Sequence, residues 1–143
     1  MNSIRLPYYA LSVEAYKGFI SVKNALEKST LGIAIIELVY MRVSQINGCP
    51  YCLNMHAKSL RAHNETNERI DALPGWRISK SYSEKERAAL NWVELVTNIS
   101  TSDANDESFI QLKEHFTDIE IADLTMAISL MNAFNRIAIS MRQ

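Results

Sequence analysis

Apolar residues recur with helical spacing along most of the chain. Between residues 10 and 28 they mark one face of a helix: Leu11, Ala15, Phe19, Val22 and Leu26. The range 31–46 is apolar on nearly every side, and Glu37 and Arg42 are its only charged residues. Such a pattern is typical of a helix that is buried all round. The first third of the chain is therefore predicted to form two helices, the second of them deeply buried.

Local signals divide the remaining sequence into further helices. Asn47-Gly48 is a helix stop, and Pro50 suits the first turn of a new helix that runs to about His63. A short helix ending near Leu73 is expected to follow. Two capping boxes then start helices at Ser83 and Thr117. These helices are predicted to run to about residues 99 and 141, with a short helix over 106–116 between them.

Length and composition fit one all-α domain of six or seven helices over residues 1–143. The chain is 48% hydrophobic and 22% charged, with only 4 Gly and 3 Pro. A net charge of −1 argues against broad electrostatic binding to nucleic acid or to an acidic membrane. No apolar stretch is long enough to span a bilayer, and the first residues do not read as a signal peptide. The expected location is therefore the cytoplasm.

Cys49 and Cys52 lie three residues apart at a predicted helix start. One helical turn brings such residues together, so their thiols can form a disulfide without a large backbone movement. The helix N-terminus favours a thiolate, and His56 lies four residues after Cys52, where it can accept a thiol proton. Because cytoplasmic cysteines start reduced, a disulfide here is expected to be a working redox state.

Glu37 is a carboxylate inside an otherwise apolar helix. If the helices on either side of Asn47-Gly48 pack antiparallel, Glu37 lies at about the height of His56 and farther from Cys49. It would then orient the imidazole and help it to accept a proton. The imidazole in turn would offset the cost of burying a charge.

Other interpretations of these residues are open. Cys49 and Cys52 could be two small core residues, or with His56 they could be ligands of a structural zinc ion, although a clear fourth ligand is missing. Glu37 alone could pair with an arginine, and His56 alone could be a surface histidine. The set as a whole favours thiol chemistry, for which no cofactor and no metal are expected.

The spacing Glu-x11-Cys-x2-Cys-x3-His resembles the pattern that identifies the AhpD-like alkylhydroperoxidases, within the carboxymuconolactone decarboxylase family. The resemblance is strong over residues 36–73 and extends more loosely over most of the chain, including 83–92, 116–124 and 132–136. It implies an all-α fold, assembly into a homo-oligomer and reduction of peroxides by thiols.

By position, the resemblance implies roles for four residues. Cys52 would attack the peroxide, Cys49 would resolve the product, and Glu37 and His56 would form a proton relay. Some well-known members carry a His immediately before the second cysteine, where this chain has Tyr51. The relay would then run through water or the Tyr51 hydroxyl. Members that decarboxylate a lactone generally lack the cysteine pair, so that activity is the poorer match.

The function expected from these residues is reduction of hydroperoxides, with an external dithiol or a disulfide-reducing protein as the electron donor. The alternative is a redox sensor or adaptor with little turnover. Residues 49–52 also look like the glutaredoxin active-site tetrapeptide. That fold needs a strand before the motif and a mixed sheet, and the long apolar segment before Cys49 does not fit it.

Two segments suggest self-assembly. The ranges 31–46 and 124–139 are both apolar on more than one face and carry few charges. A domain of this size can shield only a limited number of such helices, so an obligate homo-oligomer is expected. The alternative is that short helices near Arg69 and Phe109 cover these faces within one chain.

Overall fold

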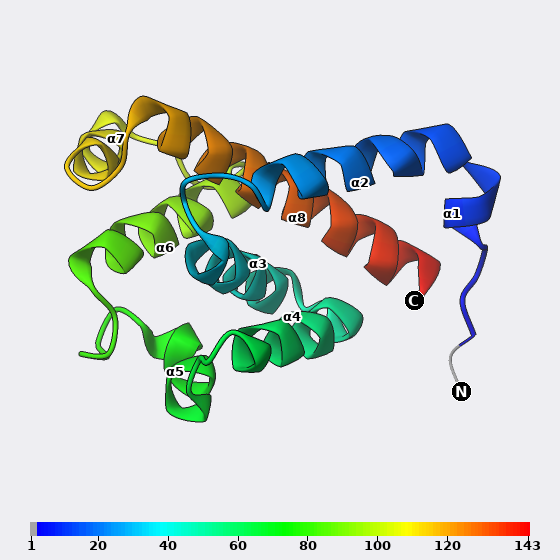
Figure 1. Cartoon of the computed structure of the whole chain (residues 1–143), viewed down its shortest axis with the longest axis horizontal. Coiled ribbons are helices and arrows are strands. Elements are labelled where there is room, and N and C mark those ends of the chain that lie inside the picture. The colour runs from blue at the N-terminus through cyan, green and yellow to red at the C-terminus, as the bar shows by residue number, and fades with distance from the viewer. Residues whose placement is uncertain (1–2) are drawn as a thin grey trace.

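The computed structural model describes residues 3–143, so the first two residues of the expected domain lie outside it. Every regular element in this range is helical, as expected for an all-α fold (Figure 1). The elements are α1 (Tyr8–Leu11), α2 (Val13–Leu26), α3 (Ile33–Asn47), α4 (Pro50–Ala62), α5 (Asn67–Ala72), a 3-10 turn (Leu73–Gly75), α6 (Glu84–Thr97), α7 (Asp106–Lys113) and α8 (Asp118–Met141). Within the same residues, no helix combines the length and the apolar character needed to cross a membrane.

The helix expected over residues 10–28 is divided in two. Ser12, with φ −110° and ψ 57°, lies outside helical geometry and separates α1 from α2. The extra turn begins at Pro7, whose ring fixes its φ near the helical value. A single non-helical residue does not disturb the spacing of apolar side chains. The apolar pattern therefore does not reveal the break. With α1 counted separately, the described chain has eight α-helices where the sequence predicts six or seven.

α3 is the central helix and packs against α8, α4 and α6 (Figure 1). Nearly all of its side chains from Ile36 to Ser44 are buried. Its apolar faces are thus covered within one chain, mainly by long helices rather than by the short ones considered from the sequence. The argument for self-assembly from residues 31–46 is therefore wrong. In α8, Met126 and Ile139 stay 54% and 44% exposed.

The bundle has two apolar cores that share α3. The larger one lies between α3, α6 and α8 and includes Ile36, Val93 and Ile128. The smaller one lies between α3, α4 and the segment after α5, and it includes Leu60 and Trp76. α4 follows α3 after a short turn and runs back along it (Figure 1). The start of α4 therefore lies where α3 ends and close to the last turns of α8.

Candidate active site

The turn between α3 and α4 places both cysteines at the start of a helix, as predicted. Gly48 ends α3 with φ 67° and ψ 44°, a left-handed conformation that glycine adopts without strain. Cys49 caps α4, and Pro50 occupies the first helical turn. The backbone N–H of Cys52 donates to Cys49 Sγ over 3.3 Å, so a sulfur takes the place of the usual capping oxygen.

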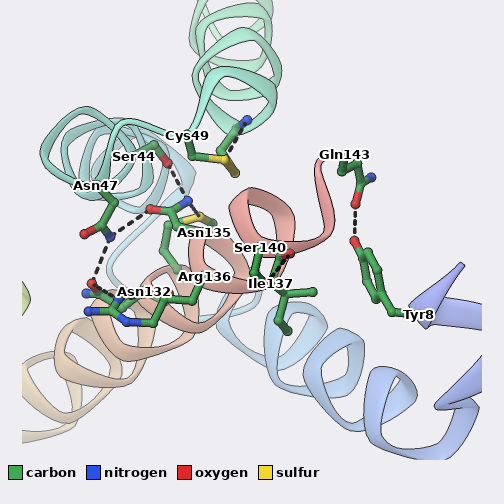
Figure 2. The surroundings of a disulfide bond; sticks show 12 residues. Tyr8, Ser44, Asn47, Cys49, Asn132, Asn135, Arg136, Ile137, Ser140 and Gln143 are labelled. Atoms are coloured by element: carbon green, nitrogen blue, oxygen red, sulfur yellow. Dashed lines mark hydrogen bonds between the residues drawn. A yellow bond between two sulfur atoms is a disulfide. The ribbon is translucent and has the colours of Figure 1, made fainter. Parts of the chain in front are cut away.

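Cys49 and Cys52 form a disulfide with their Cα atoms 5.3 Å apart, a separation that is ordinary for such bonds. Both side chains are buried and pack with Ala138 of α8. Figure 2 shows Cys49 at the start of α4, facing α8. Sulfurs joined in this way offer no thiolate to a metal ion. In the part of the chain that the structure describes, no three His, Cys, Asp or Glu side chains are grouped to hold one.

Glu37 and His56 form a buried pair across the α3–α4 interface. Glu37 Oε2 lies 2.8 Å from His56 Nδ1, and the two residues are 7% and 2% exposed. A carboxylate accepts the hydrogen bond from Nδ1–H, so the lone pair of the neutral imidazole lies on Nε2. The expected approach of these two side chains is confirmed, and the charge of Glu37 has a partner.

A cavity of about 200 Å³ beside α4 is lined by both Cys52 and His56. Most of its wall is apolar and comes from α2, α4 and α8: Ile20, Met55, Leu130, Met131, Phe134 and Ala138. Tyr51 also lines it and is 43% exposed, so this ring lies at the edge of the cavity. Cys49 does not line this cavity. It borders a different depression together with Arg5 and Arg142.

Two buried polar atoms beside this cavity have no hydrogen-bond partner within residues 3–143. They are His56 Nε2 and Tyr40 Oη. The two rings lie 5.2 Å apart, and Tyr40 is 1% exposed. Burial, and to a smaller extent the charge of Glu37, raises the pKa of Tyr40 well above its usual value, so the hydroxyl keeps its proton. Tyr40 and His56, each with a polar atom that lacks a partner, thus both line this cavity, whose wall also carries polar side chains such as those of Tyr8 and Lys23.

Tyr40 was not among the site residues predicted from the sequence. A tyrosine in a buried helix looks like a core residue, because the pattern does not reveal whether its hydroxyl has a partner. One signal was present: Tyr40 lies three residues after Glu37, so both side chains share one face of α3.

A buried polar network, also missed, fixes the end of α3 against α8 (Figure 2). Asn135 is fully buried, and its Nδ2 donates to Ser44 Oγ over 3.1 Å. Asn47 Nδ2 donates to Asn135 Oδ1 over 3.1 Å and to Asn132 Oδ1 over 3.0 Å. These bonds hold the cysteine-bearing turn in place relative to α8.

Asn135→Ala is expected to lower the free energy of unfolding by about 1–3 kcal/mol, because Ser44 and Asn47 lose a buried partner. Urea denaturation measures the change. Asn54→Ala, on the exposed side of α4, is the matched control and should stay within about 0.5 kcal/mol of the wild type. Equal stability of the two variants would contradict the importance of the network.

The chain is similar to known proteins in sequence and in structure. Its sequence matches the family model of the carboxymuconolactone decarboxylase family over residues 14–95. It is 34% identical over 139 residues to the uncharacterized protein YdfG of Bacillus subtilis, covering 97% of this chain and 95% of that protein.

Solved structures give the same result. A protein of unknown function from Agrobacterium tumefaciens, whose name suggests the antioxidant defence protein AhpD, is 39% identical and superposes with a TM-score of 0.94 over 99% of this chain and 97% of that one. An uncharacterized peroxidase-related protein from Silicibacter sp. TM1040 is 26% identical, with a TM-score of 0.83 over 94% of this chain and 72% of that one.

Proposed function

Because the chain is an AhpD-like member of the carboxymuconolactone decarboxylase family, we propose that it is a thiol peroxidase that reduces hydroperoxides through Cys49 and Cys52. One observation carries the proposal: a disulfide-forming cysteine and a carboxylate-supported histidine border the same cavity. A nucleophile beside an oriented base is the arrangement that thiol catalysis needs.

The first step oxidises Cys52. In the reduced protein, His56 Nε2 accepts the thiol proton, and Glu37 stabilises the resulting imidazolium through Nδ1. The thiolate attacks the terminal oxygen of the hydroperoxide, so that an S–O bond forms as the O–O bond breaks. The other oxygen leaves with the electron pair, takes the proton from His56 and departs as an alcohol. Cys52 is left as a sulfenic acid.

The second step forms the disulfide. The Cys49 thiolate attacks the sulfur of the Cys52 sulfenic acid, and hydroxide leaves and is protonated to water. The cap position of Cys49 favours its thiolate, and the cysteines are close enough to bond without a movement of α4. The disulfide in the structure is the product that this step would give.

An external dithiol would restore the pair. Its thiolate attacks Cys49 Sγ from the depression beside Arg5 and Arg142, and Cys52 leaves as a thiolate next to His56. The second thiol of the donor then attacks the mixed disulfide and frees Cys49. The donor ends as a disulfide, so two electrons pass to the protein in each cycle.

A second candidate function is redox sensing, because the disulfide packs directly on α8 through Ala138 and its reduction could change that packing. The two functions differ in turnover. With excess hydroperoxide and a dithiol donor, the peroxidase consumes many equivalents of hydroperoxide per chain. If consumption stops after one equivalent while the donor remains, the chain is a sensor.

We also propose that the chain assembles into a homo-oligomer, now on the evidence of its exposed side chains. Large apolar residues on α1, next to it and on α4 are 39–68% exposed: Leu6, Tyr9, Leu11, Val13, Tyr51 and Met55. Packing against a second copy would remove this apolar surface from water. Sedimentation equilibrium at low micromolar concentration should give a multiple of 16.2 kDa. A stable folded species at the monomer mass would contradict the proposal.

A further inference from the structure

We propose that Tyr40 is a further catalytic residue, whose hydroxyl donates a hydrogen bond to the oxygen that leaves when Cys52 attacks a hydroperoxide. This inference rests on the proposed function and adds a residue outside the Glu-x11-Cys-x2-Cys-x3-His pattern. Tyr40 would stabilise the leaving oxygen, whereas Glu37 and His56 act on the attacking sulfur.

The position of Tyr40 is the first argument. It lies one turn after Glu37 on α3 and faces α4, and its ring lies 5.2 Å from that of His56. The cavity that Cys52 lines is also lined by Tyr40 and His56. Cys52, His56 and Tyr40 therefore border a single space of about 200 Å³.

The second argument is the unpartnered hydroxyl. Tyr40 Oη is buried without a hydrogen-bond partner in the described part of the chain. The hydroxyl of Tyr82, another buried tyrosine, donates to the backbone carbonyl of Arg69. A buried hydroxyl without an acceptor costs free energy, and a phenylalanine would fill the same space without that cost. A ligand oxygen beside His56 would provide the missing acceptor.

The chemistry supplies the third argument. As the O–O bond breaks, negative charge develops on the leaving oxygen inside a largely apolar cavity, where a fixed donor stabilises it more than in water. Burial and the nearby Glu37 raise the pKa of Tyr40, so it remains a donor throughout the neutral range. The proton that ends on the alcohol comes from His56. The Tyr40 hydroxyl is therefore unchanged after each turnover.

The test uses hydroperoxides with different leaving groups. Reduced wild type, Tyr40→Phe and Tyr82→Phe are mixed with cumene hydroperoxide or with peroxybenzoic acid, and the loss of thiols is followed by stopped flow. A carboxylate is a good leaving group and needs little stabilisation, whereas an alkoxide needs much. Tyr40→Phe should slow the cumene hydroperoxide reaction about 10-fold or more and the peroxybenzoic acid reaction less than about 3-fold. Tyr82→Phe should match the wild type with both.

Four results would overturn the inference. Tyr40→Phe could react at the wild-type rate, or it could lose the same factor with both peroxides, which would indicate damage to Cys52 or to the cavity. A melting temperature clearly below that of the wild type would show that the hydroxyl has a structural partner, because removal of an unpartnered group should not destabilise the fold. A wild-type protein that reacts with neither peroxide would overturn the proposed function as well, so the two failures are distinguishable.

Discussion

Cys52→Ser is expected to abolish the reaction with hydroperoxides, whereas Cys49→Ser should complete the first step and stop there. Cys52 lines the same cavity as His56, and Cys49 borders a different depression. Without Cys49 no thiol is left to resolve the sulfenic acid, so it should accumulate on Cys52. Treatment with peroxide and dimedone, followed by mass spectrometry of the peptides, should label Cys52 in Cys49→Ser and nothing in Cys52→Ser.

The opposite labelling pattern would reverse the roles of the two cysteines. A reversed assignment has a physical basis, because Cys49 caps α4 and a helix N-terminus favours the thiolate form. Proximity to a base decides against this alternative: His56 is one turn from Cys52 and shares its cavity. Label on Cys49 in Cys52→Ser, with Cys52 unlabelled in Cys49→Ser, would therefore show that the cap effect dominates.

Glu37→Gln is expected to slow the oxidation of Cys52 by about 10- to 100-fold at neutral pH. The substitution keeps the size of the side chain and an oxygen acceptor for His56 Nδ1, but it removes the charge that stabilises the imidazolium. His56 then takes the proton of the Cys52 thiol less readily, so less of Cys52 is thiolate at neutral pH. The rate profile should shift to higher pH, so the variant should approach the wild-type rate only in alkaline solution.

Stopped-flow rates of thiol loss between neutral and alkaline pH measure this shift, and circular dichroism verifies the fold. Glu14→Gln is the control, since Glu14 is exposed and pairs with Lys17 on the surface of α2. Its profile should coincide with that of the wild type. An unchanged profile in Glu37→Gln would remove Glu37 from the relay.

Much of the site could be predicted because local signals place it. Gly48 and Pro50 define the helix end and the helix start, and the residue counts on either side bring Glu37 to the height of His56. Helical rise and capping depend on residues that are close together along the chain, so both can be predicted from the sequence. The three-residue spacing of Cys49 and Cys52 likewise predicts that they can form a disulfide.

The features that escaped prediction depend on distant partners or on single atoms. Asn135 lies in a long apolar helix, and its partner Ser44 is 91 residues away in the sequence. Tyr40 contributes to the core with its ring, so the apolar pattern hides the hydroxyl that lacks a partner. The apolar pattern of residues 31–46 predicts burial but not what covers the helix, because that depends on how three other helices pack against α3.

A single-turnover experiment tests the central proposal most directly. Reduced wild-type protein is mixed with one equivalent of cumene hydroperoxide per chain, and the remaining thiols, the alcohol formed and the protein mass are determined. The proposed mechanism predicts one alcohol and the loss of both thiols for each hydroperoxide consumed, with a protein mass lower by two hydrogen atoms. Hydroperoxide that persists beside two intact thiols would contradict it.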